Sequence, residues 1–89
     1  MLKTKKGFIM RKVMNEYMVV AVGPASDALN GMIRMNEAGS FLWKELEAGI
    51  SENDLVAKMM ARYQGLDAQT ARADLREFLD SIAIAVEEV

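Results

Sequence analysis

The sequence predicts an α+β fold in which an N-terminal three-stranded antiparallel sheet precedes three helices, an arrangement like a winged helix-turn-helix domain. Residues 8–35 hold β-branched and apolar runs separated by turn residues, whereas residues 36–86 show helical periodicity and helix caps. The charge also changes near residue 36, with six basic and two acidic side chains before it and five and eleven after it. A chain of 89 residues has room for one hydrophobic core. We therefore expect a single domain over residues 1–89, with residues 1–6 as a mobile tail.

The sheet is predicted from three apolar runs within residues 8–35. Residues 8–14 and 17–22 are expected to form the first two strands, joined by a turn at Asn15-Glu16, and Gly23-Pro24 ends the second. Residues 23–31 form a loop that closes with the turn signal Asn30-Gly31. Residues 32–35 are then too few for a helix and are expected to form the third strand. On that strand, the alternation of side chains turns Ile33 and Met35 toward the helices and leaves Met32 and Arg34 outside.

The three helices are predicted from caps that precede apolar stripes. Asn36, Ser51 and Asp67 are the expected N-caps, and Gly49 and Gly65 are the expected ends of the first two helices. Trp43 lies beside the apolar stripe of the first helix and is expected to be a half-buried anchor against the sheet. The third stripe is the most regular and consists of Ala71, Leu75, Phe78, Leu79, Ile82 and Val86.

Composition excludes several classes of function. The chain has no Cys and no His, which removes disulfides, Cys/His zinc sites and Ser–His or Cys–His catalysis. Its carboxylates are expected on solvated helix faces, and no glycine-rich phosphate loop or dense acidic cluster is present. We therefore expect neither an enzyme nor a bound metal or cofactor. The net charge of −2 argues against nucleic-acid binding, and the absence of a signal peptide or apolar span predicts a cytoplasmic protein without membrane contact.

The third strand is expected to lie at an edge of the sheet. It carries one charge, Arg34, and no Pro, although edge strands are usually protected by charge, Pro or coverage. Such an edge either accepts a further strand from a peptide or is covered by a loop or helix. The sequence alone leaves both interpretations open, and the same edge could join two copies of the chain into a homodimer.

The segment from Asn30 to Trp43, NGMIRMNEAGSFLW, resembles the hallmark of the PqqD-like family. That hallmark is a short strand ending in Leu, then Asn-Glu-Thr-Gly, a small residue and an apolar pair before Trp. Here Met35 replaces the Leu, and Ala38 replaces the Thr. The preceding hairpin, the acidic second helix and the run Asp74–Leu79 extend the similarity over nearly the whole chain. The C-terminus departs from the family, because it ends Ala-Val-Glu-Glu-Val instead of a Gly-Leu-Leu-like tail.

The resemblance implies a non-catalytic peptide chaperone that binds the leader of a ribosomally made precursor peptide. It also implies a modifying enzyme as partner, of the radical S-adenosylmethionine type that acts in pyrroloquinoline quinone biosynthesis. In such domains the leader is added as a strand to the third strand, in the groove beside the third helix. The residues implied here are Met32, Ile33, Arg34 and Met35 on the strand, and Ala71, Arg72, Leu75, Arg76, Phe78 and Leu79 on the helix. Arg72 and Arg76 are expected to flank the groove and to pair with acidic leader residues.

Two alternatives compete with this interpretation. A winged-helix DNA-binding protein would have the same order of strands and helices, but Asp67, Asp74, Glu77 and Asp80 on the last helix would repel phosphates. A structural dimerisation module would use the open sheet edge to bind a second copy.

Overall fold

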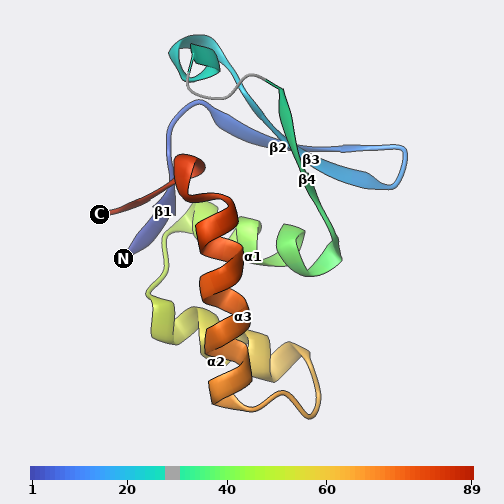
Figure 1. Ribbon diagram of the computed structural model, residues 1–89, viewed down its shortest axis with the longest axis vertical. Helices are drawn as coiled ribbons and strands as arrows, with labels where there is room; N and C mark the ends of the chain where they lie inside the picture. Colours follow the sequence, from blue (N-terminus) through green and yellow to red (C-terminus); the bar gives the residue numbers. More distant parts are fainter. Residues whose placement is uncertain (28–30) are drawn as a thin grey trace.

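A computed structural model describes residues 1–27 and 31–89 of the chain. Its first strand, β1 (Leu2–Thr4), is followed by β2 (Phe8–Val13), β3 (Glu16–Ala21), a 3-10 turn at Gly23–Asp27 and β4 (Met32–Met35). Three helices follow: α1 (Glu37–Ala48), α2 (Glu52–Arg62) and α3 (Ala68–Ser81). A second 3-10 turn (Ala83–Ala85) then leads into β5 (Val86–Glu88). The predicted α+β order of strands before three helices, in a winged-helix-like arrangement, is confirmed. In Figure 1 the sheet of β2, β3 and β4 lies at one end of the molecule and α2 at the other.

The main sheet is antiparallel, in the order β2-β3-β4. Its hairpin turn falls at Met14-Asn15, one residue earlier than predicted, because both residues have positive φ angles, of 50° and 70°. Positive φ at both central positions is the geometry of two-residue turns whose twist matches the flanking strands. The predicted turn at Asn30-Gly31 includes Asn30, which lies outside the described residues.

The two ends of the chain form a second sheet that the sequence did not predict. β1 pairs with β5 in an antiparallel register that sets Leu2 opposite Glu88 and Thr4 opposite Val86. The N–H of Leu2 also donates to the carbonyl of Ile50 at 2.7 Å. The expectation that residues 1–6 form a mobile tail is therefore wrong for Leu2–Thr4. Figure 1 shows the two termini side by side.

The last helix is shorter than its apolar stripe suggested. α3 ends at Ser81, and Val86 belongs to β5 instead of the helix. Residues 86–88 pair with β1 instead of continuing the helical hydrogen bonds, and this pairing satisfies their backbone groups. The three-helix part of the chain thus spans 37–81, not 36–86.

One hydrophobic cluster joins the inner face of the main sheet to the helices. Trp43 is fully buried, not half-buried as predicted, and it lies in this cluster with Leu46, Leu55 and Leu75. Val19, at the centre of β3, is the strand residue with no exposed surface. None of the described helices combines the length and the apolar character that a membrane-spanning segment requires.

All three predicted N-caps are confirmed. Asn36, Ser51 and Asp67 each accept a hydrogen bond from the backbone N–H three residues later, at 2.7, 3.1 and 2.7 Å. The C-terminal end of α1 is at Gly49, whose φ of 87° suits glycine. α2 ends at Arg62 and is capped by Tyr63 instead of Gly65. Gly65 lies in the following turn, with a φ of 83°.

The Asp67 cap makes the stability of the domain depend on pH. The Thr70 N–H donates to the Asp67 carboxylate and holds its pKa below the ordinary value of 3.8. The charged form is therefore favoured in the folded state, and its stabilising contribution is present above pH 3.8 and lost as the pH falls through the lower, folded-state pKa. We expect Asp67→Asn, which keeps a capping oxygen but cannot titrate, to lack this part of the acid sensitivity. Urea unfolding of both proteins over a pH series measures the difference, and parallel curves would contradict the prediction.

Candidate functional site

The edge of the main sheet at β4 is the first part of the site. β3 pairs with one side of β4, setting Val19 opposite Ile33 and Tyr17 opposite Met35. In the described chain the other side of β4 is the sheet edge. The predicted alternation is confirmed, because Met32 is 55% exposed and Arg34 is exposed, whereas Ile33 is half-buried and Met35 is buried.

A narrow groove runs between β4 and α3. It has a volume of about 210 Å³ and brings the strand residues Ile33, Arg34 and Met35 together with the helix residue Phe78. Asn36 and Gly39 line it where the strand passes into α1, and Ser81 and Ile82 line it at the C-terminal end of α3. The edge strand and the end of α3 therefore border the same groove.

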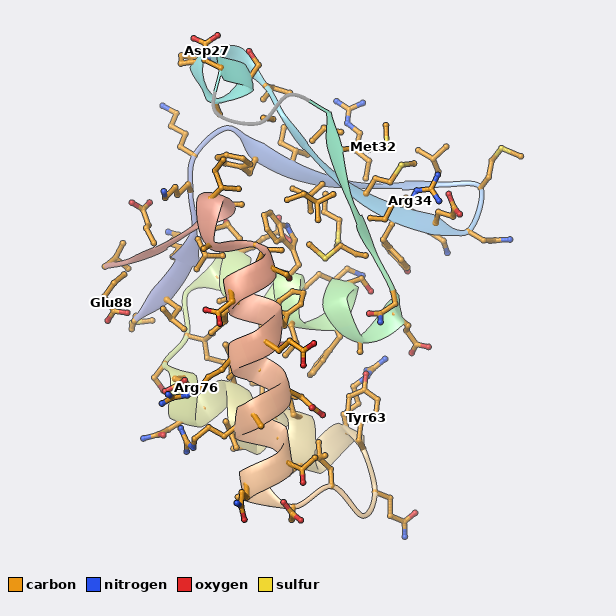
Figure 2. All side chains as sticks on the ribbon, viewed as in Figure 1. Asp27, Met32, Arg34, Tyr63, Arg76 and Glu88 are labelled. Carbon is orange, nitrogen blue, oxygen red and sulfur yellow. The ribbon has the colours of Figure 1, made fainter. Side chains whose placement is uncertain are left out.

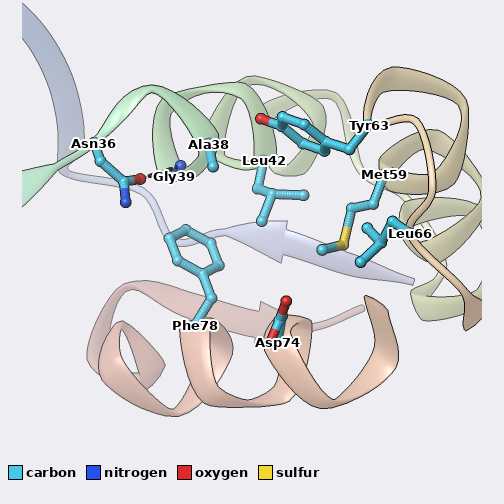
Figure 3. Close-up of a pocket in the computed structure, with 9 residues that line it drawn as sticks. All are labelled: Asn36, Ala38, Gly39, Leu42, Met59, Tyr63, Leu66, Asp74 and Phe78. Carbon is cyan, nitrogen blue, oxygen red and sulfur yellow. Dashed lines mark hydrogen bonds between the residues drawn. The ribbon is translucent and has the colours of Figure 1, made fainter. Parts of the chain in front are cut away.

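A larger cavity between the three helices adjoins the groove and is shown in Figure 3. This cavity has a volume of about 360 Å³ and shares Asn36, Gly39 and Phe78 with the groove. Its far wall is mostly apolar, and the side chain of Asp74 reaches into the opening from α3. The remaining lining residues are Ala38, Leu42, Met59, Tyr63 and Leu66.

Gly39 allows the helix and the strand to meet closely at this junction. A methyl group on Gly39 would lie 3.2 Å from Cε1 of Phe78 and 3.2 Å from Sδ of Met35. The Asn36 side chain accepts from the Gly39 N–H at 2.7 Å, so it both caps α1 and lines the groove. The predicted role of Asn36 as a cap is confirmed, and both Asn36 and Gly39 also border the site.

The structure does not place all of the predicted helix residues beside β4. Ala71 and Leu75 have no exposed surface and support the groove from inside the core. Leu79 lies on the other flank of α3, in a cavity that it shares with Leu2 of β1 and Glu52 of α2. Among the predicted helix residues, Phe78 is the one that lines the groove.

Arg72 and Arg76 also lie on the flank of α3 that faces away from the groove. Arg72 donates to Glu52 at 3.5 Å and to Asn53 at 3.1 Å, and Arg76 pairs with Glu52 at 3.5 Å. In Figure 2, Arg76 and Arg34 lie on opposite sides of α3. The structure therefore does not bring these two arginines, which were expected to flank the groove, to its lining. Each residue turns a helix by about 100°, so positions 72, 76 and 79 form one flank and 74, 78 and 81 the other.

The residues that sequence reasoning missed are Asp74 and Ser81 on α3, together with the lining role of Asn36 and Gly39. The two α3 residues could have been found from their spacing, because residues 74, 78 and 81 are four and three positions apart and therefore share one flank of the helix. In the described residues, no group of three or more acidic side chains is placed to hold a metal ion. The site is therefore a strand edge beside a groove of mixed polar and apolar lining, with a mostly apolar cavity next to it, which suits an extended peptide.

Comparison with known proteins identifies a structure with a similar fold and a matching family. A search of curated proteins found no match. A solved structure described as TbiB1 in complex with the TbiA(beta) leader peptide has the same fold, with a TM-score of 0.74 and 23% sequence identity over 91% of this chain and 87% of that chain. The family model described as coenzyme PQQ synthesis protein D (PqqD) matches residues 16–84. This match covers β3, β4 and all three helices, and the chain therefore belongs to the PqqD family.

Proposed function

We propose that this protein binds the leader segment of a ribosomally made precursor peptide and presents it to a modifying enzyme, without catalysing the reaction itself. The observation that carries the proposal is the open edge of β4 alongside a groove lined by both polar and apolar side chains. Such an edge binds a peptide through main-chain hydrogen bonds, and the adjoining pockets select its side chains. Membership of the PqqD family and the leader peptide named with the similar TbiB1 structure support the same function.

The proposed contacts follow from the groove. Met32, Ile33, Arg34 and Met35 would supply the edge to which the leader is added. Side chains of the leader that point inward would pack on Phe78 and reach the cavity behind it. Arg34 is exposed and would be available to an acidic leader residue. Arg72, Arg76 and Leu79 are not included, because they occupy the other flank of α3.

The modifying enzyme is proposed to be of the radical S-adenosylmethionine type. This follows from the description of the family as a coenzyme PQQ synthesis protein and from the resemblance of residues 30–43. The protein itself would act as a binding partner that offers the groove beside β4 to the leader.

Alternate N-methylation of the peptide tests whether the leader binds as a strand. The probe is a synthetic leader segment of each short precursor peptide encoded beside the gene for this protein. A strand at a sheet edge uses every second N–H for pairing, so methylating one alternate set should weaken binding by tenfold or more (~1.4 kcal/mol). Methylating the other set should leave the affinity near that of the unmodified peptide.

Amide NMR titration of the protein with the leader peptide tests which residues of the protein are affected by binding. We expect shifts at residues 32–35 and around Phe78 and Ser81, with Arg72 and Arg76 little affected. If both N-methylated peptides bind as the unmodified one does, strand addition is ruled out. If none of the neighbouring precursor leaders shifts any amide, the proposed function itself fails.

A further inference from the structure

The outer face of the main sheet is an apolar surface that no described element covers. The strand register sets Ile9, Val20 and Met32 in one row across the three strands. It sets Arg11, Met18 and Arg34 in the next row. Figure 2 shows Met32 and Arg34 on the side of β4 that faces away from the helices.

This face exposes more apolar surface than a solvated sheet face usually does. Ile9, Val13 and Met32 are 40, 46 and 55% exposed, whereas Val19 on the inner face is completely buried. An antiparallel sheet with one solvated face normally shows polar residues on that face. A contiguous exposed apolar patch with polar residues at its border is typical of a protein interaction site.

A depression at one end of the face provides a place for a partner side chain. It has a volume of about 510 Å³ and is formed mainly by Ile9, Val22, Pro24 and Ala25, with Lys6 at its border. Apolar anchors that fill such pockets contribute much of the binding energy in protein interfaces.

The charges on the face indicate what kind of surface it fits. Within the described residues, neither Arg11 nor Arg34 forms a salt bridge, although five other ion pairs are present. Both arginines lie in one row, on either side of Met18. Strands β2 and β3 contain one acidic residue, Glu16, which lies at the hairpin end. A second copy placed symmetrically on this face would bring arginines toward arginines, which is unfavourable. An apolar surface bordered by carboxylates would complement it.

We propose that the outer face of the main sheet is the docking surface for the modifying enzyme, through an apolar patch of that enzyme bordered by acidic side chains. The identification of the partner as the modifying enzyme rests on the proposed function. This location also explains how the leader would be presented to the enzyme, because a leader strand added to β4 would extend the same sheet. Every second side chain of the leader would then point to the outer face, beside Met32 and Arg34. The enzyme would thus contact the protein and its bound peptide on one continuous surface.

Charge-introducing variants on β2 test the docking surface separately from the leader site. Ile9→Glu and Arg11→Glu lie on the strand farthest from the β4 edge, and both positions are exposed, so the fold should be kept. Lys44→Glu, at an exposed position of α1 whose ammonium lies over the Tyr17 ring, is the control for a change of charge elsewhere. The probes are the purified radical S-adenosylmethionine enzyme encoded beside the gene and a fluorescent leader peptide, titrated separately.

We expect Ile9→Glu and Arg11→Glu to weaken enzyme binding by tenfold or more, and Lys44→Glu to leave it unchanged. The effect of Arg11→Glu should shrink at high salt, because salt screens exposed charges. Both β2 variants should still bind the leader peptide as the wild type does. Unchanged enzyme affinity in both variants would overturn the proposal. Sedimentation that shows a wild-type dimer abolished by Ile9→Glu would also overturn it, by assigning the face to a second copy. Failure of the wild type to bind any leader would instead contradict the proposed function.

Discussion

Phe78→Ala should weaken binding of the leader peptide by about 30-fold, or ~2 kcal/mol, because it removes the aromatic wall of the groove. Phe78 is half-buried and borders both the groove beside β4 and the larger cavity between the helices. Its ring lies over Gly39, so that truncation would merge the two spaces and leave an inward-pointing leader side chain without a partner. Titration of the labelled leader peptide measures the change in affinity.

Leu79→Ala is the matched control for this prediction. Leu79 is adjacent in sequence and is also half-buried, but it faces the cavity beside β1 on the other flank of α3. We expect its leader affinity to stay near that of the wild type. The reverse result, with Leu79→Ala impaired and Phe78→Ala unaffected, would show that the leader uses the other flank of the helix.

Leu75→Ala should lower the free energy of unfolding by about 2–5 kcal/mol, the cost of removing a buried leucine side chain and leaving a cavity. Leu75 has no exposed surface and belongs to the cluster that joins α3 to the sheet and the other helices. Small domains are stable by only about 5–15 kcal/mol, so the loss would be a large part of the total. Urea denaturation followed by circular dichroism gives the value.

Arg76→Ala, one position further along α3, provides the comparison. Its side chain is 67% exposed, and it is paired with Glu52 at 3.5 Å. Surface ion pairs contribute at most about 1 kcal/mol, so this variant should unfold close to the wild type. If Arg76→Ala destabilised the protein as much as Leu75→Ala, the packing described for α3 would be incorrect.

Local signals in the sequence were sufficient for most elements. The caps at Asn36, Ser51 and Asp67 depend on a side chain and a backbone N–H three residues apart, so they can be read directly from the sequence. The alternation on β4 likewise depends on the period of two in a strand. The hairpin turn was misplaced by one residue, because positive φ at Met14 is unusual for that residue type and has no sequence signal.

The order of strands and helices, the edge position of β4 and the alternation of Met32, Ile33, Arg34 and Met35 could be predicted without the structure. The flank of α3 that meets β4 could not be predicted in this way, and it is this flank that makes Phe78 line the groove while Arg72 and Arg76 pair with α2. Helical periodicity tells which residues share a face, but the neighbour of each flank depends on how the helices pack. The pairing of Leu2–Thr4 with Val86–Glu88 could not be predicted either, because it joins residues more than 80 positions apart through backbone groups that every sequence carries.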